Sequence, residues 1–142
     1  MEKNVLLLML AIIMPFSVMA WDGKDLKKLN NSGDCIACDL SNLDLFGVNL
    51  SNSNLSGTDL SGSNLRNTNF SRTNLGGSNL NNANLSGADL SSSNLKDANL
   101  ANAKLGMANL ANANLSNAYL GQKVTQMFLC VKFQTRQEWM LL

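Results

Sequence analysis

An apolar residue stands at every fifth position of this 142-residue chain from position 40 to position 120. All of these residues are leucine except Phe70. The seventeen positions are Leu40, Leu45, Leu50, Leu55, Leu60, Leu65, Phe70, Leu75, Leu80, Leu85, Leu90, Leu95, Leu100, Leu105, Leu110, Leu115 and Leu120. Such an unbroken internal repeat is the strongest indication of architecture in the chain, because it outweighs the local preferences of single segments.

A period of five does not fit a long regular element. On an α-helix, where successive residues turn by about 100°, the leucines would spread around every side. On a straight strand, an odd spacing would send successive leucines to opposite faces. The leucines share one interior only if the chain turns once in each repeat. The pattern therefore predicts an all-β solenoid in which the leucines point inward as core centres.

The positions around each leucine support this arrangement. From Leu55 onward, the residue two places before each centre is small, such as Ser63 or Ala83, as a narrow interior requires, whereas Leu43 and Val48 are bulkier. One residue before each centre stands Asn or Asp in fifteen of the seventeen repeats, and Lys104 and Tyr119 are the exceptions. The two residues after it are mostly Ser, Gly or Asn, which favour tight turns and positive φ. These corner residues, Asn81 among them, are predicted to point outward and to tolerate a charge.

This stretch resembles the pentapeptide-repeat family, whose motif is A(D/N)Lxx. Close matches are Ala83-Asn84-Leu85, Ala88-Asp89-Leu90, Ala98-Asn99-Leu100, Ala108-Asn109-Leu110 and Ala113-Asn114-Leu115. The resemblance covers residues 38–122 and implies a right-handed quadrilateral β-helix with four repeats to a coil and about four coils. Residues twenty apart would then stack, which predicts a ladder of Asn54, Asn74, Asn94 and Asn114. A disordered low-complexity segment is the alternative from composition, but disorder gives no reason to keep a strict period.

Residues 1–20 have the features of a secretory signal peptide. Lys3 precedes an apolar run from Val5 to Phe16, and small residues end the segment at Ala20. A membrane anchor is the alternative, but the run is shorter than the ~20 residues that span a bilayer. Cleavage after Ala20 would leave a protein without a membrane anchor, and we expect it to be secreted or periplasmic.

The segment before the repeats, residues 21–37, is predicted to be an N-terminal cap segment. Trp21, Leu26 and Leu29 fit one face of a short helix that Ser32-Gly33 would end. Such a helix would cover the open edge of the first coil and protect it from pairing with other chains.

The segment after the repeats, residues 123–142, contains no further repeat. Its apolar side chains, such as Met127, Phe128 and Phe133, are too many for a free tail. They are predicted either to cover the last coil as a C-terminal cap or to be buried in the contact of a homodimer.

Cys35 and Cys38 are predicted to form a disulfide. Counted back from Leu40, both fall at inward positions on either side of one corner. An exported chain meets an oxidising compartment, which favours the bond. Two buried thiols are the alternative, whereas a thioredoxin-like motif lacks its βαβ surroundings and a zinc site is disfavoured because the chain has no histidine. Cys130 remains as an odd third thiol.

The net charge of the chain is +1, and residues 38–122 carry four basic and five acidic residues, a net charge of −1. The repeats therefore offer neither a basic stripe for nucleic acid nor a strongly acidic surface. Most of the carboxylates occupy the position that Asn fills in other repeats. The sequence thus predicts no catalytic residue, no cofactor and no bound metal, and we expect no enzyme.

The leading hypothesis is a secreted or periplasmic structural or protein-interaction scaffold, with an unknown protein partner and no nucleic-acid ligand. The family resemblance supplies an alternative, since some cytoplasmic members mimic DNA and bind a topoisomerase, DNA gyrase. That activity implies an acidic surface and a cytoplasmic address, and the sequence predicts neither. An exported effector is a third hypothesis, which no residue tests.

Overall fold

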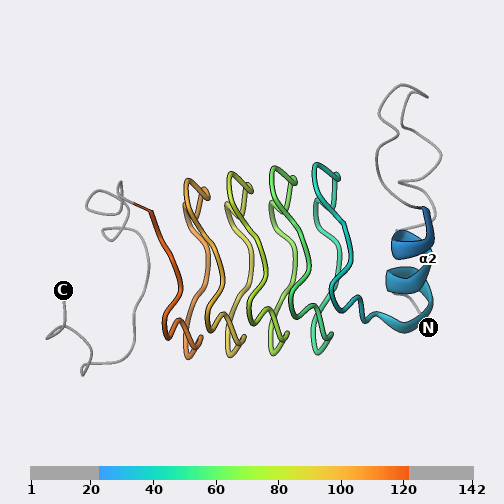
Figure 1. Cartoon of the computed structure of the whole chain (residues 1–142). Coiled ribbons are helices and arrows are strands. Elements are labelled where there is room, and N and C mark those ends of the chain that lie inside the picture. The colour runs from blue at the N-terminus through green and yellow to red at the C-terminus, as the bar shows by residue number, and fades with distance from the viewer. Residues whose placement is uncertain (1–22, 122–142) are drawn as a thin grey trace, which may run out of the picture.

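The computed structural model describes residues 23–121 of the chain (Figure 1). The predicted signal peptide, Trp21 and the predicted C-terminal cap at residues 123–142 lie outside the described residues. The described part begins with helix α2 (Gly23–Ser32) and continues as stacked turns of chain. No helix within residues 23–121 is long and apolar enough to cross a membrane.

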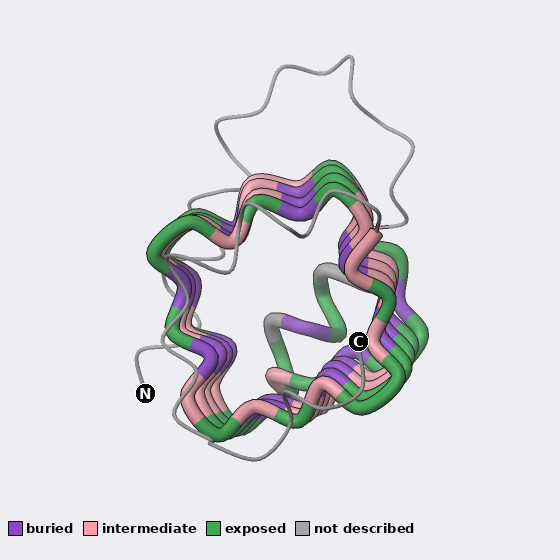
Figure 2. Tube along the Cα trace, turned by 90° about the vertical axis from the view of Figure 1, so that its left-hand side faces the viewer, coloured by how far each residue is buried: buried purple, intermediate pink, exposed green. Residues whose placement is uncertain are grey.

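The repeats form a continuous coil that returns to the same side after every twenty residues. Parallel β-bridges join residues twenty apart, from Asp39–Asp59 at one end to Asn99–Tyr119 at the other. Seen along its axis, the coil has a four-sided outline (Figure 2), so one side corresponds to one five-residue repeat. We call residues 40–59 the first coil and residues 100–119 the last coil.

Backbone hydrogen bonds join neighbouring coils along every side. In the middle of the solenoid, Leu75 N donates to Asn94 O of the next coil at 2.7 Å. In the same repeat, Asn74 N donates to Ser53 O of the previous coil at 2.9 Å. Parallel strands paired in this way lie ~4.8 Å apart. Each coil therefore draws its stability mainly from its two neighbours, as in other solenoids.

Each corner is a tight turn whose second residue has positive φ. Val48 N donates to Leu45 O at 3.2 Å, and Gly47 between them has a φ of 66°. The same sign of φ recurs at each following corner, as type II turns require. Gly and Asn are common at this position because they tolerate the left-handed conformation. Arg72 (φ 58°) and Met107 (φ 59°) adopt it at a conformational cost.

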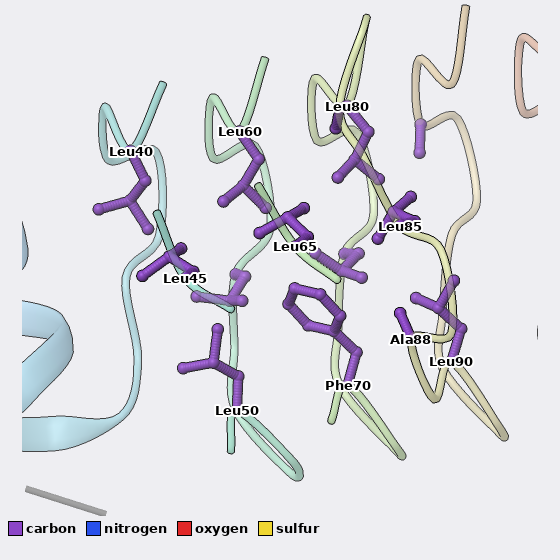
Figure 3. Packing of buried hydrophobic residues seen from close by; sticks show 14 of the residues in the cluster. Leu40, Leu45, Leu50, Leu60, Leu65, Phe70, Leu80, Leu85, Ala88 and Leu90 are labelled. Atoms are coloured by element: carbon purple, nitrogen blue, oxygen red, sulfur yellow. The ribbon is translucent and has the colours of Figure 1, made fainter. Parts of the chain in front are cut away.

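The leucine centres line the interior of the coil (Figure 3). Fourteen of the seventeen, namely those from Leu40 to Leu100 and Leu110, are at most 4 % exposed. Leu105, Leu115 and Leu120 are partly buried. These centres are less buried than the equivalence of the repeats suggests, because they lie in or beside the last coil and no further coil covers it within the described residues.

The small inward residues of the earlier coils carry hydroxyl groups that bond to the backbone. Thr68 Oγ1 donates to Leu45 O at 2.8 Å, and Ser63 and Thr73 make equivalent bonds in the adjoining repeats. Ser78 Oγ is buried without a hydrogen-bond partner among the described residues. A satisfied hydroxyl costs little to bury, whereas the hydroxyl of Ser78 retains its full desolvation cost.

Asn81 stands at a corner outside the core, but its side chain is half-buried rather than freely exposed. Its side-chain Oδ1 is buried and has no hydrogen-bond partner within residues 23–121. The side chain therefore lies against the coil, and a charge at this position would not be harmless. The repeat pattern does not reveal this, because a corner side chain can fold back onto the neighbouring coil.

Helix α2 lies at the N-terminal end of the coil, within its outline when seen along the axis (Figures 1 and 2). It buries Leu29, which is 1 % exposed; the side chain of Leu26 lies outside the described part. The helix ends at Ser32, and Gly33 (φ 74°) donates its N–H to Leu29 O at 2.8 Å. A left-handed glycine after the last helical residue is a common helix end, so the predicted stop at Ser32-Gly33 is confirmed.

Candidate functional site: the faces and the N-terminal end

Several of the Asn residues that precede a leucine make two kinds of hydrogen bond. Within its own corner, Asn74 Oδ1 accepts the N–H of Gly76 at 3.2 Å. Between coils, Asn74 Nδ2 donates to Asn54 Oδ1 at 3.1 Å, and Asn94 Nδ2 donates to Asn74 Oδ1 at 2.9 Å. Asn114 extends this row at 3.3 Å, so the predicted ladder is confirmed. The amide groups of this face are bonded mainly to one another and to their own corners.

Aspartate takes part in these rows as an acceptor. Asp59 Oδ1 accepts from Ser61 N at 2.8 Å and from Asn79 Nδ2 at 3.2 Å. When ionised, it has no hydrogen to donate to Asp39, its bridge partner in the previous turn. Hydrogen bonds from the hydroxyl and the backbone N–H of Ser41 hold the pKa of Asp39 below its usual range. This row therefore begins with two carboxylates that do not bond to each other.

Charged and aromatic side chains are sparse along the corners. The guanidinium carbon of Arg66 lies 5.8 Å from the centroid of the Phe46 ring, a cation–π contact between neighbouring coils. Lys96 and Asp97 approach to 4.0 Å, but both side chains are 55 % exposed, so this ion pair contributes little. The faces present neutral amides and hydroxyls rather than a charged stripe.

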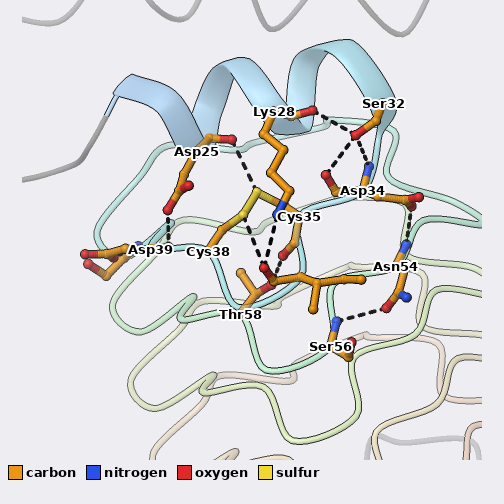
Figure 4. The surroundings of a disulfide bond; sticks show 12 residues. Asp25, Lys28, Ser32, Asp34, Cys35, Cys38, Asp39, Asn54, Ser56 and Thr58 are labelled. Carbon is orange, nitrogen blue, oxygen red and sulfur yellow. Dashed lines mark hydrogen bonds between the residues drawn. A yellow bond between two sulfur atoms is a disulfide. The ribbon is translucent and has the colours of Figure 1, made fainter.

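The predicted disulfide is present between Cys35 and Cys38, with an S–S distance of 2.02 Å and a Cα–Cα distance of 5.4 Å. Both cysteines are buried beneath α2 (Figure 4). Cys35 Sγ lies 3.2 Å from Asp25 O on the helix, a close contact rather than a hydrogen bond, since a disulfide sulfur has no hydrogen to donate. Thr58 Oγ1 donates to Cys35 O, which joins the same corner to the next turn of the coil.

Two aspartates occupy the exposed backbone edge at the N-terminal end (Figure 4). Asp39 N donates to Asp25 Oδ2 of α2 at 2.8 Å. Asn54 N donates to Asp34 Oδ1 at 2.6 Å. In later coils the equivalent N–H groups donate to backbone carbonyls, as Asp59 N does. Side-chain carboxylates thus replace the missing coil on part of this edge.

The repeat pattern did not single out these two aspartates. Asp34 carries a usable signal, because it stands twenty residues before Asn54 and so falls in the same column of the coil. Asp25 carries no such signal, because it lies on α2 and outside the five-residue register.

The acidic side chains of the described part of the chain do not gather into a metal-binding cluster. Within residues 23–121, no group of three or more His, Cys, Asp or Glu side chains could hold a metal ion. The carboxylates of Asp25, Asp34 and Asp59 accept backbone N–H groups. These hydrogen bonds hold the backbone at the N-terminal edge and within the corners of the coil.

A family model for pentapeptide repeats matches the chain in eight copies, over residues 38–77, 68–106 and 93–122. These matches cover more than half of the chain. The chain belongs to the pentapeptide repeat family. Solved members of this family form right-handed quadrilateral β-helices, the architecture to which the four-sided coil described above corresponds. Among curated proteins, no match is found.

Several solved pentapeptide repeat proteins resemble this one. Rfr23 from the cyanobacterium Cyanothece is 32 % identical with a TM-score of 0.51, over 69 % of this chain and 90 % of Rfr23. A protein from the thylakoid lumen of Arabidopsis thaliana is 29 % identical with a TM-score of 0.61, over 62 % of each chain. HetL from the cyanobacterium Nostoc, involved in heterocyst differentiation regulation, is 30 % identical with a TM-score of 0.51, over 61 % of this chain and 48 % of HetL.

This pentapeptide repeat protein thus matches about half the length of HetL and 62 % of the thylakoid protein. A form of QnrB1, a plasmid-mediated fluoroquinolone resistance protein, is 18 % identical with a TM-score of 0.50, over 71 % of this chain and 57 % of QnrB1. At this identity the similarity to QnrB1 extends to the fold alone.

Proposed function

We propose that this pentapeptide repeat protein is an exported, non-catalytic scaffold that presents its flat faces to a protein partner. The proposal rests on the hydrogen bonding of the side chains that cover one face of the coil. The amides of Asn54, Asn74 and Asn94 are engaged in a regular ladder. A face of this kind is rigid and evenly spaced, and it suits recognition of shape better than chemistry on a bound substrate.

Export is supported by two features. Residues 1–20 read as a signal peptide, and the Cys35–Cys38 disulfide is typical of proteins in oxidising compartments. The corresponding test is the N-terminus of material purified from the periplasm or the medium. It should begin at Trp21, whereas cytosolic protein that retains Met1 would contradict export.

We assign helix α2 the role of N-terminal cap of a solenoid of about four coils. The support is the buried Leu29 and the carboxylate of Asp25, which accepts an edge N–H of the first turn. An uncovered edge would expose backbone groups that pair readily with other chains.

The scaffold function is tested by capture of a partner with variants of two different faces. Asn109→Arg and Lys104→Glu each change one exposed side chain of the last coil, on neighbouring faces. We expect a partner captured by the wild-type protein to be lost with one variant and kept with the other. Equal capture by both variants would mean that neither face is the binding surface, and absence of any saturable partner would contradict the proposal.

The alternative function, binding to a topoisomerase, is tested by a DNA gyrase supercoiling assay. The repeats carry a net charge of −1 and lack the acidic surface that imitation of duplex DNA requires. We therefore expect no inhibition and no protection of the enzyme from a quinolone. A dose-dependent effect of the folded protein would reverse this ranking.

A further inference from the structure

The last coil has apolar surface that the middle of the solenoid does not expose. Leu115 and Leu120 are partly buried, whereas Leu95 and Leu100, at the same places one coil earlier, are at most 2 % exposed. A centre becomes fully buried only when a neighbouring coil or another cover lies on each side of it.

Two exposed large hydrophobic side chains lie at the same end, and the two others among the described residues, Ile36 and Phe46, lie toward the N-terminal end. Of the four exposed large hydrophobic residues in the described part of the chain, Met107 (82 % exposed) and Tyr119 (59 % exposed) belong to the last coil. Met107 also holds a corner with a φ of 59°, a conformation that costs a non-glycine residue about 1 kcal/mol. Apolar surface exposed beside partly buried core residues at the end of a solenoid indicates a place where something else packs.

The backbone of the last coil needs a neighbour as well. Leu100 N donates to Tyr119 O, nineteen residues further on, at 2.7 Å. By the same register, the N–H groups of Leu105 and Leu110, on two successive sides of the coil, would find acceptors nineteen residues further on, at Val124 and Leu129. Because half-buried backbone groups are nearly always paired, this end requires a cover that offers carbonyl groups as well as apolar side chains.

We propose that this end is covered by the chain's own residues 122–142, and that the run from Val124 to Phe133 docks against the edge of the last coil as two short strands joined by a corner, one on each of two successive sides. The run reads VTQMFLCVKF, rich in β-branched and aromatic residues and free of Gly and Pro, which is the composition of a strand. A strand added to an open edge supplies main-chain acceptors along its length.

The length of the segment permits this. Twenty-one residues follow Gly121 and can extend over about 70 Å, while one side of the coil spans only about 15 Å. A further repeat of the usual kind is excluded, because Lys123 would stand at the small inward position and bury its ammonium group. The cover therefore follows the edge of the last coil without the small inward residue that begins the other repeats.

The chain's own segment is favoured over a second molecule by its attachment point. Gly121 lies against the last coil, so that a Cβ placed on it would be 3.4 Å from Ala101 Cα. A segment tethered there is held near the end of the coil at an effective concentration on the order of millimolar, above that of a second molecule in dilute solution.

The first test uses the thiol of Cys130, which lies within the docking run, as a probe in the full-length mature protein. Alkylation is followed with the Cys35–Cys38 disulfide intact, in buffer and in urea, together with the molar mass by light scattering. We expect a monomer whose Cys130 reacts at least about tenfold more slowly in buffer than in urea. Equal rates in both solvents would overturn the proposal, and protection that appears only in a dimer would assign the surface to a second copy instead.

The second test compares Phe128→Asp with Gln126→Asp. In the five-residue register Phe128 stands at an inward position, whereas Gln126 stands at a corner, where the same added charge stays in solvent. Phe128→Asp is expected to raise the alkylation rate of Cys130 toward its rate in urea. It should also speed hydrogen exchange at Leu105 and Leu110 while leaving Leu65 unchanged, whereas Gln126→Asp should change neither. Unchanged protection of Cys130 and of both amides in Phe128→Asp would overturn the docking. Hydrogen exchange at the Leu65 amide distinguishes local release of the docked run from general unfolding of the solenoid.

Discussion

The second corner residue of each repeat sits in a left-handed conformation, and what a side chain there meets depends on the neighbouring coil. Gly77 and Gly87 have φ of 64° and 72°, so alanine is strained at both. A Cβ on Gly77 would meet nothing within 4 Å, whereas a Cβ on Gly87 would collide with Oδ1 of Asn67 in the previous coil. We expect Gly77→Ala to cost about 1 kcal/mol and Gly87→Ala about 1 kcal/mol more, measured by urea unfolding.

A double-mutant cycle isolates the collision from the strain. Asn67→Gly removes the obstructing side chain and keeps a residue that tolerates positive φ. In that background, Gly87→Ala should cost no more than Gly77→Ala does in the wild-type protein. An undiminished cost would show that the side chain of Asn67 is not the obstacle.

The buried hydroxyl of Ser78 offers an opposite prediction, a substitution that stabilises. Ser78 Oγ has no partner among the described residues, and alanine fills the same position of the repeat at Ala83 and Ala98. Ser78→Ala should therefore raise the free energy of unfolding by about 1 kcal/mol. Thr73→Ala is the matched control and should lower it by about 1–2 kcal/mol, because Thr73 Oγ1 donates to Leu50 O. Thermal melts of the two variants that shift in the same direction would contradict this account.

At the scale of the element, the side-chain rows are built from donors and acceptors that must alternate. Asp59 cannot donate to Asp39 below it, although Asn79 donates to Asp59 from the coil above. Asp59→Asn would keep both bonds that Asp59 accepts and add a donor for Asp39. We expect stabilisation by about 0.5–1 kcal/mol in urea unfolding.

Asp97→Asn is the control for that substitution, because it removes the same charge from a place with no carboxylate beneath it. Gly77 stands one coil earlier in this column, and Asp97 Oδ1 already accepts from Asn117 Nδ2 at 3.1 Å. This variant should change stability little. If Asp97→Asn raised the free energy of unfolding as much as Asp59→Asn, the cause would be the change in net charge and not a new hydrogen bond to Asp39.

Sequence periodicity predicts what depends on the repeat itself. The inward leucines, the corners and the Asn54–Asn114 ladder all follow from a fixed register, since every coil repeats the same contacts. It does not predict Asn81, whose side chain folds against the coil, or Asp25, which reaches the edge from a helix outside the register. Such features depend on a three-dimensional neighbour that has no fixed spacing along the chain.

The same reasoning applies to the two ends of the solenoid. The Cys35–Cys38 pair could be predicted because both positions continue the register backwards from Leu40. The partial burial of Leu115 and Leu120 could not, because position in the repeat says nothing about how many coils lie above. Burial at an end is a property of the whole stack.

At the scale of the whole molecule, every coil makes the same contacts with its neighbours, so the removal of one complete coil should leave a foldable solenoid. Parallel bridges join residues twenty apart throughout, as in Asp59–Asn79 and Asn79–Asn99. Deleting residues 60–79 joins Asp59 to Leu80 and preserves the order of small residue, Asp or Asn, and leucine across the junction. The side-chain rows and the bridges can then form again between the coils that remain.

We expect the protein lacking residues 60–79 to fold with the same β-type circular dichroism per residue. Its urea m-value should fall by about a quarter, because one coil in about four no longer contributes surface on unfolding. Deleting residues 60–77 is the matched control, since it leaves Ser78 and Asn79 as two extra residues before Leu80 and shifts every later contact out of register. That variant should lose most of its cooperative transition. If both deletions unfold alike, the coils are not interchangeable units, and the stability of the solenoid must reside in contacts specific to one coil.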